Sequence, residues 1–371
     1  MPLFLLCFFL FVNTYAQENS VTINVQTKDL PAGSKVFITG NNRQMGSWNP
    51  GLIELDSIAE NIRSKKFLFS KGENIEFKIT RGDWQNEAIY KVGETPANFR
   101  LKVEKDTAIS IFIEHWKDQF EQIIVGQITG NVEYVKDLEG EGILPRDIII
   151  WLPPGYDSNL NHYYPVLYMH DGQNLFDPRT ASFGVDWQLD ETADSLIRNE
   201  IIEEIIIVGI YNSSERRSDY SPGSKGYAYM NFIVNKLKPF IDEKYRTLPD
   251  RENTAVGGSS MGGLISFMLL WEHNDVFAKA ACFSPAFKYI GLDYVSFVDS
   301  TASDKRSFSL YLDNGDVGLE EQLQSGIDDM MEVLKKHGYE FEWFIDKNAE
   351  HNEAAWAKRA WRPLIQFFRK E

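Results

Sequence analysis

The chain contains no hydrophobic run long enough to cross a bilayer as a helix, since such a helix needs about 20 apolar residues. The apolar stretch Leu3–Val12 has ten residues and lies in a segment, Met1–Ala16, that carries no charged side chain. A short apolar run followed by a small residue is typical of a signal peptide, although Lys or Arg is missing at its start. We therefore expect residues 1–16 to be a cleaved signal peptide and the mature protein to be periplasmic or secreted, with no integral membrane segment.

Cysteine is equally scarce. Cys7 leaves with the predicted signal peptide, and Cys282 is then the only cysteine that remains. One cysteine cannot form an intrachain disulfide or a cysteine-based metal site. We therefore expect the mature fold to be held together by packing alone.

Positive charge is in deficit, with 38 Lys and Arg against 54 Asp and Glu and a net charge of −16. A surface of that sign repels phosphate backbones and anionic lipids, so we expect no nucleic-acid partner. The charge is unevenly distributed, because residues 17–118 contain fourteen basic and fourteen acidic residues and the whole excess lies in residues 119–371. For this reason we place a domain boundary near His115–Gln119.

Residues 17–118 are predicted to form an all-β sandwich. Short strand-like runs recur at regular spacing, turn residues separate them, and no helix-period segment of any length is present. The predicted strands are Val21–Thr27, Lys35–Thr39, Lys66–Phe69, Ile75–Thr80, Arg100–Glu104 and Ala108–Ile113.

Residues 119–371 alternate apolar strands with amphipathic helices, which predicts an α/β domain with a mostly parallel central sheet covered on both faces. The predicted strands are Ile148–Leu152, Val166–Met169, Ile205–Ile210, Asn253–Val256, Lys279–Phe283, Ser307–Leu312 and Glu340–Ile345. The predicted helices are Asp186–Arg198, Gly226–Tyr245, Gly263–His273, Gly326–His337 and Glu353–Phe368.

The pentapeptide Gly258–Gly262 has the pattern Gly-x-Ser-x-Gly with Ser260 at its centre. It lies between a predicted strand and a predicted helix, which is the setting of a nucleophile elbow. A serine on so sharp a turn adopts an unfavourable backbone conformation, so its neighbours must lack bulk. Amides at the start of the helix would face negative charge that develops on a substrate oxygen. We assign Ser260 as the nucleophile, with an ordinary serine on a glycine-rich turn as the alternative.

Together with this elbow, two further stretches resemble the putative esterase (esterase D-like) family: Tyr164–Asp177, which contains His-Asp-Gly-Gln-Asn, and Glu350–Asn352. The resemblance covers about residues 120–371. It implies an α/β-hydrolase fold, and the family includes feruloyl and acetyl-xylan esterases, siderophore esterases, S-formylglutathione hydrolase and mycolyltransferases. The His-Asp-Gly-Gln-Asn stretch is specific, whereas the elbow is common to the whole fold.

A serine nucleophile needs a base, and the chain order in this fold is serine, acid, histidine. Three histidines follow the nucleophile, namely His273, His337 and His351. His273 and His337 close amphipathic helices, where a cation is favourable for structural reasons. His351 follows the predicted strand Glu340–Ile345 in a short polar loop, where the fold places its base. We therefore assign His351 as the base.

The acid should follow the predicted strand Ser307–Leu312, where Asp313, Asp316 and Glu320 compete. The resemblance favours Glu320, because relatives such as S-formylglutathione hydrolase show acid-x-x-Leu-x-x-Gly, which Glu320–Gly326 matches with a longer loop before it. Glu serves as well as Asp in this fold. Asp316 and Asp313 remain alternatives, and the carboxylates that are not used are expected to make turn or cap contacts.

An oxyanion hole needs two backbone N–H groups. Met261, which follows the nucleophile, should supply one, and the resemblance implies Gln173 for the other, with Gly172 allowing close approach. His170 and Asp171 are expected to support this loop. They lack a third and a fourth ligand at metal-binding spacing, so we expect no metal and no cofactor.

The stretch Arg216–Pro222 follows the predicted strand Ile205–Ile210 and resembles a family loop beside the active site. Arg217 is the residue of this loop that we expect to contact a polar or acidic substrate. A solvated turn with local ion pairs is the alternative.

The first region resembles a starch-binding-type carbohydrate-binding module over about residues 18–116, in the stretches Val36–Asn42, Met45–Pro50 and Phe77–Trp84. Indole rings stack on the flat faces of sugars. By the family pattern, Trp48 and Trp84 stack on sugar and Lys78 hydrogen-bonds to it. A purely structural sandwich, with Trp48 capping the core, is the alternative.

These features together predict an exported serine esterase that cleaves carboxylic esters, with acyl groups on carbohydrate as the substrate class. Ser260, His351 and Glu320 would form its triad, and a polysaccharide or a small ester would be its partner. One alternative is a siderophore-ester hydrolase or acyltransferase of the same family, and another is a non-catalytic glycan-binding protein. A glycosidase is disfavoured, because no carboxylate pair stands out.

Overall fold

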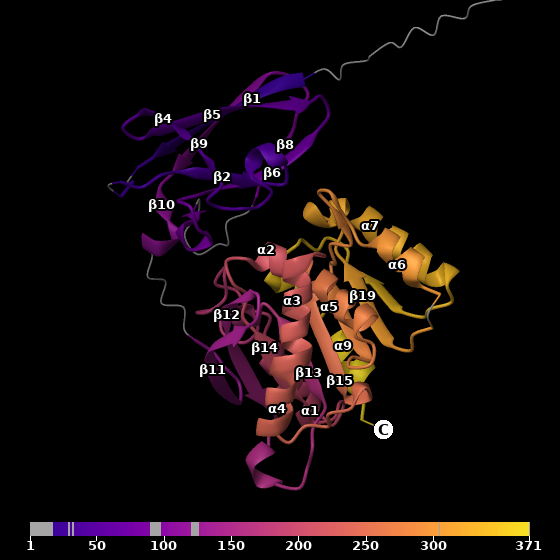
Figure 1. Cartoon of the computed structure of the whole chain (residues 1–371). Coiled ribbons are helices and arrows are strands. Elements are labelled where there is room, and N and C mark those ends of the chain that lie inside the picture. The colour runs from indigo at the N-terminus through magenta and orange to yellow at the C-terminus, as the bar shows by residue number, and fades with distance from the viewer. Residues whose placement is uncertain are drawn as a thin grey trace, which may run out of the picture. The chain divides into compact units, whose positions relative to one another are not determined.

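The computed structural model describes residues 18–28, 30–31, 33–89, 98–119, 126–303 and 305–370. The predicted signal peptide, residues 1–16, lies outside these ranges. The chain divides into two compact units, Met1–Gln122 and Ile123–Glu371 (Figure 1). This division falls close to the predicted boundary between residues 118 and 119.

The first unit is a β-sandwich of two four-stranded sheets, in the orders β4-β5-β1-β9 and β3-β2-β6-β8, with a separate β10-β7 ladder. Val21, Ile23 and Val25 of β1 share one hydrophobic core with Ile75 and Phe77 of β6. All six predicted strands are present, which confirms the predicted sandwich. The strands are β1 (Glu18–Thr27), β2 (Phe37–Gly40), β3 (Ile53–Glu54), β4 (Asp56–Ala59), β5 (Ile62–Ser70), β6 (Asn74–Thr80), β7 (Ala88–Ile89), β8 (Phe99–Lys102), β9 (Thr107–Ile113) and β10 (His115–Trp116).

The second unit is built on an eight-stranded sheet in the order β11-β12-β14-β13-β15-β16-β19-β20. Strands β14, β13, β15, β16, β19 and β20 run parallel, and β12 and β11 are added antiparallel at one edge. The sheet confirms the predicted α/β class. Its strands are β11 (Asn131–Gly140), β12 (Ile143–Leu152), β13 (Val166–His170), β14 (Ile206–Ile210), β15 (Thr254–Ser259), β16 (Lys279–Phe283), β19 (Ser309–Asn314) and β20 (Glu342–Ile345), and β17 (Lys288–Tyr289) pairs with β18 (Leu292–Asp293) outside it.

Helices cover both faces of this sheet (Figure 1). Ile148 and Ile150 of β12 pack in one core with α3, α4, α5, α6 and α7, whereas Ile149 and Trp151 pack in the other with α1, α8 and α9. Successive strand residues therefore point to opposite faces, as pleating requires. The helices are α1 (Leu189–Arg198), α2 (Arg216–Asp219), α3 (Ser224–Phe232), α4 (Lys238–Lys244), α5 (Met261–Glu272), α6 (Val295–Thr301), α7 (Leu319–Lys336), α8 (Glu353–Ala357) and α9 (Trp361–Phe368).

Some elements differ from the prediction. Helix α7 begins at Leu319, well before the predicted start at Gly326, after Gly318 has taken a left-handed φ of 69°. The predicted helix Glu353–Phe368 is divided into α8 and α9. Strand β11 is missing from the prediction, because its many exposed side chains break the hydrophobic pattern.

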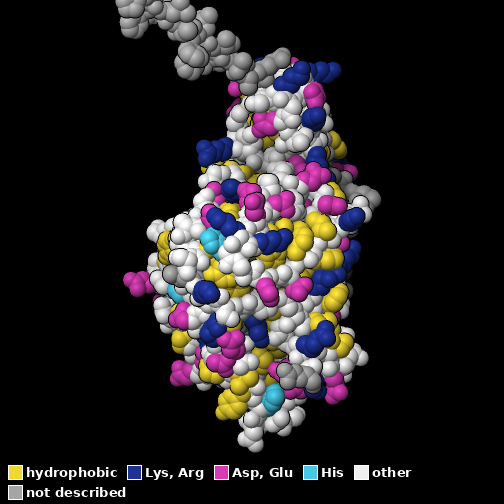
Figure 2. Space-filling view, turned by 90° about the vertical axis from the view of Figure 1, so that its right-hand side faces the viewer, with side chains coloured by type: hydrophobic (Ala, Val, Ile, Leu, Met, Phe, Trp, Pro, Cys, Tyr) yellow, Lys and Arg dark blue, Asp and Glu magenta, His cyan; other side chains and the backbone are white. Residues whose placement is uncertain are grey.

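The surface of the molecule mixes charges of both signs. On the face shown in Figure 2, acidic and basic side chains are interspersed, with hydrophobic side chains in small groups between them. The net charge of −16 is therefore not gathered into one continuous patch on this face. Within the described ranges, every helix is too short or too polar to cross a membrane.

Candidate active site

Ser260 lies at the turn between β15 and α5, where its backbone has φ 58° and ψ −119°. A non-glycine residue in such a region is uncommon and costs about 1–3 kcal/mol. The amide of Ser260 donates to the carbonyl of Phe283 at 2.9 Å, which fixes the turn to the end of β16. A Cβ at Gly258 would meet backbone atoms of Gly262 at 3.0 Å, so bulk is excluded beside the serine. The turn therefore has the geometry of a nucleophile elbow.

Glu320 and His351 meet although 30 residues separate them. Nδ1 of His351 lies 2.9 Å from Oε2 of Glu320, and the Glu320 side chain is fully buried near the start of α7. The other oxygen, Oε1, accepts a hydrogen bond from Ser284 Oγ at 2.7 Å. Burial opposes ionisation of Glu320, but the nearby His351 and these hydrogen bonds outweigh it and hold the pKa below its ordinary value. Glu320 is thus a carboxylate that orients a histidine, as the acid of a triad does.

The two competing carboxylates are engaged elsewhere. Asp313 is fully buried and accepts two hydrogen bonds from Arg359, at 2.8 and 3.1 Å. Asp316 accepts a hydrogen bond from the amide of Asn348 at 2.6 Å. Of the three candidates, Glu320 is therefore the one whose carboxylate the structure brings to His351.

Ser260 and His351 are linked through Phe283, the last residue of β16, and Ser284, which follows it. Phe283 accepts the hydrogen bond of the Ser260 amide, and Ser284 donates to Glu320, which contacts His351. The carboxyl ends of parallel strands lie at one edge of the sheet, so these groups share that edge. Because Nδ1 of His351 faces Glu320, Nε2 is the ring nitrogen that remains for a serine hydroxyl.

Three residues around the Glu320–His351 pair were not identified from the sequence, namely Ser284, Trp356 and Arg359. Trp356 donates from Nε1 to Ser284 Oγ at 3.1 Å, and its ring lies edge to face with the His351 ring at a centroid distance of 4.9 Å. Arg359 also donates to Ser284 Oγ, at 3.2 Å. Trp356 and Arg359 follow His351 closely in the chain whereas Ser284 is distant from it, and the three follow no motif, so only the tertiary fold reveals their contacts.

The two predicted oxyanion amides lie at the starts of helical turns. Met261 is the first residue of α5, and Gln173 is the second residue of the 3-10 helix η5 (Gly172–Asn174). The first amides of a helix have no acceptor within that helix and can face a ligand. Gly172 allows η5 to approach β14, because a Cβ there would lie 2.5 Å from the carbonyl carbon of Gly209.

His170 and Asp171 support the η5 loop, as expected. Nδ1 of His170 lies 2.8 Å from the Tyr229 hydroxyl, and burial lowers the pKa of His170 to about 3, so this imidazole is neutral. Asp171 has a φ of 57°, and its carboxylate accepts hydrogen bonds from Arg216 at 2.7 and 2.6 Å and from Asn212 at 2.6 Å. Both side chains are therefore committed to holding the loop.

Arg217, the predicted substrate contact, is exposed on α2, and its carbonyl accepts a hydrogen bond from Ser221 at 2.6 Å. Its neighbour Arg216 is the arginine that binds the η5 loop, through Asp171. The paired arginines in the sequence do not distinguish the two roles. Contact between Arg217 and a substrate stays a prediction.

In the sandwich unit, Trp48 and Trp84 are both partly exposed, and Trp84 begins the 3-10 helix η2 (Trp84–Asn86) that follows β6. Thr80, the last residue of β6, donates from Oγ1 to the carbonyl of Pro50 at 2.6 Å, which ties the segment after Trp48 to the end of β6. Trp48 has a φ of 64°, which is rare for a bulky residue. The surrounding structure must therefore hold Trp48 in this conformation, and stacking of Trp48 and Trp84 on sugar stays a prediction.

Lys78 does not have the placement that the prediction required. Its side chain is buried, and Nζ lies 2.6 Å from Oε1 of Glu87, which is itself completely buried. Desolvation raises the pKa of Glu87 although Lys78 opposes the shift. Because separating a buried ammonium from its carboxylate is costly, Lys78 is part of the unit's interior and not of a sugar-binding surface.

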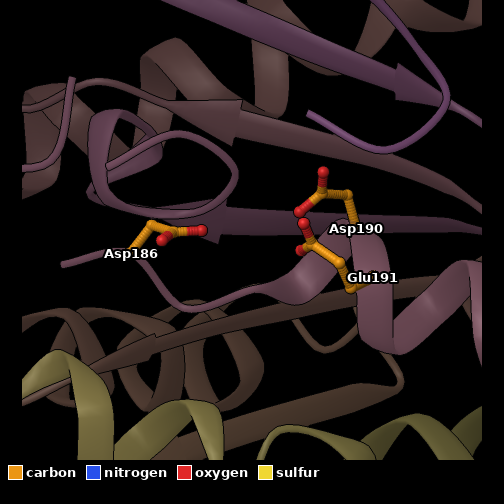
Figure 3. Close-up of side chains that lie close together, drawn as sticks. All are labelled: Asp186, Asp190 and Glu191. Carbon is orange, nitrogen blue, oxygen red and sulfur yellow. The ribbon is translucent and has the colours of Figure 1, made fainter. Parts of the chain in front are cut away.

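Among the described residues, one group of carboxylates is close enough to hold a cation: Asp186, Asp190 and Glu191, whose ligand atoms lie within 4.8 Å of one another (Figure 3). Thr129 donates its amide to Asp190 at 2.6 Å. Burial and the adjacent Glu191 raise the pKa of Asp190 to about 8, so a proton at Asp190 relieves the repulsion. The group thus has an explanation without a cation, and the absence of a metal stays a prediction.

Residues 144–363 match the family model described as putative esterase, over more than half of the chain. The chain belongs to the putative esterase family. This esterase also matches the starch binding domain model, over residues 18–110, in its sandwich unit. The predicted resemblances are therefore confirmed at the level of both families.

Relatives of this esterase match part of the chain. The uncharacterized protein YbbA of Bacillus subtilis is 25% identical over 157 residues, which are 39% of this chain and 58% of the relative. The chain thus spans less than two thirds of that curated relative. Among solved structures, a ferulic acid esterase has a TM-score of 0.55 at 21% identity and covers 64% of this chain and 98% of its own. The siderophore hydrolase EstB from Aspergillus nidulans has a TM-score of 0.52 at 14% identity, covering 64% and 94%. These likenesses establish the fold.

Proposed function

We propose that this esterase hydrolyses carboxylic esters, with acyl groups on carbohydrate as its substrates, and that it is exported by its N-terminal segment. The 2.9 Å contact between His351 Nδ1 and Glu320 Oε2 carries the proposal, because it orients the imidazole with Nε2 free to accept a proton. Membership of the putative esterase family supports ester hydrolysis, and the match to the starch binding domain supports a carbohydrate as the alcohol part of the substrate.

In the proposed reaction, Ser260 Oγ attacks the ester carbonyl carbon while its proton passes to His351 Nε2. Negative charge that develops on the carbonyl oxygen is stabilised by the amides of Met261 and Gln173. The carbon–oxygen bond to the alcohol then breaks, and the alcohol leaves with the proton from His351. Water repeats the sequence on the acyl-enzyme, which releases the carboxylic acid and restores the serine. Glu320 stabilises the imidazolium in both halves.

Two acyl classes deserve comparison. A feruloyl ester on polysaccharide is supported by the ferulic acid esterase structure together with the starch-binding match. A siderophore ester is the second candidate, supported by the fold shared with siderophore hydrolase EstB. Feruloyl, acetyl and catecholate esters distinguish them by their kcat/KM values.

The direct experiment compares the wild type with Ser260→Ala on p-nitrophenyl acetate and on this ester panel. We expect the variant to lose turnover by at least about 10⁴-fold with its circular dichroism unchanged. The matched control is Ser259→Ala, which precedes the nucleophile at the end of β15. Turnover by Ser260→Ala at the wild-type rate would overturn the proposal.

A further inference from the structure

Glu353 is a buried carboxyl group that the proposed reaction does not use. It is the first residue of α8, two residues after His351, and its exposed fraction is 6%. Its Oε1 accepts a hydrogen bond from Asn174 Nδ2 at 3.3 Å, although the two residues are 179 positions apart in the chain. A buried acid two residues from the base therefore reaches the last residue of the η5 loop.

Asn174 is the residue after Gln173, whose amide is proposed for the oxyanion hole. The other end of the Asn174 amide group, Oδ1, accepts a hydrogen bond from the amide of Ser182 at 2.8 Å. The Gln173 carbonyl accepts a further hydrogen bond from Thr180 at 2.7 Å. Side-chain hydrogen bonds therefore fix the orientation of the Gln173–Asn174 segment. Among them, the hydrogen bond to Glu353 is the one that links this segment to the part of the chain that carries His351.

We infer that Glu353 is a positioning residue. Through its hydrogen bond to Asn174, it fixes the η5 loop, which carries the Gln173 amide, relative to the segment that carries His351. The inference rests on the proposed function, since it assigns a role within that same site. Oxyanion donors must lie about 2.7–3.1 Å from the oxygen on which charge develops, so an untied loop that shifts these donors loses transition-state stabilisation more than substrate binding.

The chemistry of Glu353 suits this role. Burial is the main cause that raises its pKa to about 7, and Asp171 adds to the shift while His351 and Arg216 oppose it. A carboxyl group with a pKa near 7 is only partly ionised at neutral pH, so it can accept from Asn174 with less negative charge beside the oxyanion site than a fully ionised carboxylate would place there. A glutamine at this position keeps the acceptor and removes the charge altogether.

The test uses the full chain with p-nitrophenyl acetate as substrate. We expect Glu353→Ala to lower kcat at least about tenfold with KM within about twofold, and Glu353→Gln to keep at least half of the wild-type kcat. Asn174→Ala should reproduce the loss, and the double variant Glu353→Ala/Asn174→Ala should lose little more than either single change. Glu350→Gln, an exposed acid on the other side of His351, is the control and should match the wild type.

Several results would overturn the inference. These are a wild-type kcat in Glu353→Ala, equal losses in Glu353→Ala and Glu353→Gln, or losses that multiply in the double variant. If Glu353→Ala does not fold, Asn174→Ala alone must still show the kcat-specific loss. A wild-type protein that neither hydrolyses the ester nor reacts with a fluorophosphonate would instead defeat the proposed function itself, so the two failures are distinguishable.

Discussion

Lys78 in the sandwich unit and Glu320 in the second unit, hereafter the hydrolase unit, are both charged residues that were predicted to belong to a functional site. Both are buried, and each contacts one ionisable partner, Glu87 and His351 respectively. Lys78 faces Glu87 at 2.6 Å, and the Glu87 side chain is completely buried, so this ion pair ends in the interior of the sandwich unit. Glu320 faces Nδ1 of His351 at 2.9 Å, and an imidazole has a second nitrogen on its far side. A buried charge can therefore serve a site when its partner is an imidazole that can pass a proton and still reaches the surface, as His351 does, whereas a partner that is itself completely buried, such as Glu87, contributes to stability.

The largest effect should come from Glu320→Gln. The variant keeps the shape of the side chain but cannot stabilise the imidazolium, so kcat should fall by about 10³–10⁴-fold. Esterase kinetics at pH 7 measure this, with the exposed neighbour Glu321→Gln as control. Asp316→Asn should stay within about twofold of the wild type. The acid would be reassigned if Asp316→Asn proved the damaging change and Glu320→Gln the harmless one.

Lys78→Met tests whether the ion pair of the sandwich unit serves stability. The change leaves Glu87 buried without its cation, so the sandwich unit should lose about 3–5 kcal/mol of unfolding free energy. Urea denaturation measures the loss, and Lys66→Met, at an exposed position on β5, is the control. The protein that remains folded should bind starch as the wild type does. Weaker starch binding with unchanged stability would instead restore Lys78 as a sugar ligand.

Glu353 provides a pH-dependent test within the hydrolase unit. Its pKa is raised from 4.5 to about 7, so the folded state holds the proton more tightly than the unfolded state does. The resulting stability is fully present below about pH 4.5 and is lost as pH rises through about 7, a change of up to about 3 kcal/mol. Glu353→Gln cannot ionise, so its Tm relative to the wild type should rise by a few degrees between pH 5 and pH 8. A constant difference across this range would contradict the assignment.

The smallest effects belong to the indoles of the sandwich unit. Trp48→Ala and Trp84→Ala should each weaken starch binding by about tenfold, because each removes one stacking surface. Affinity electrophoresis in starch gels measures this, with Trp361→Ala, an exposed tryptophan of the hydrolase unit, as control. Esterase turnover on p-nitrophenyl acetate should not change in either variant. Unaltered starch binding in both would favour the purely structural sandwich.

Local patterns predicted much of the fold. Short strand-like runs between turn residues in the first unit, and apolar runs between amphipathic helices in the second, predicted strands that the structure contains, and the glycines around Ser260 indicated the elbow because the turn itself forbids bulk. Strand β11 was not predicted because it is largely exposed. The start of α7 was not predicted because Gly318, and not a polar residue, is the N-cap of that helix. Glu320 was consequently expected in a loop, although it lies in the first turn of α7.

The remaining parts of the site depend on contacts between distant residues. Asp313 was a candidate acid until Arg359, 46 residues later, was found to take both of its oxygens. Lys78 matched a family pattern, but burial against Glu87 is a property of the folded unit. No sequence spacing identifies Arg359 as the partner of Asp313 or Glu87 as the partner of Lys78, because these contacts form only in the folded chain.

The proposed reaction depends on Ser260 being a nucleophile that His351 activates. Reaction with a fluorophosphonate followed by mass spectrometry of the peptides tests it most directly, because the reagent needs an activated serine but no particular acyl group. We predict one adduct on the wild type, located at Ser260, and a rate of labelling reduced at least about 100-fold in His351→Ala. Labelling at another serine, or equally fast labelling of Ser260 in His351→Ala, would contradict the account.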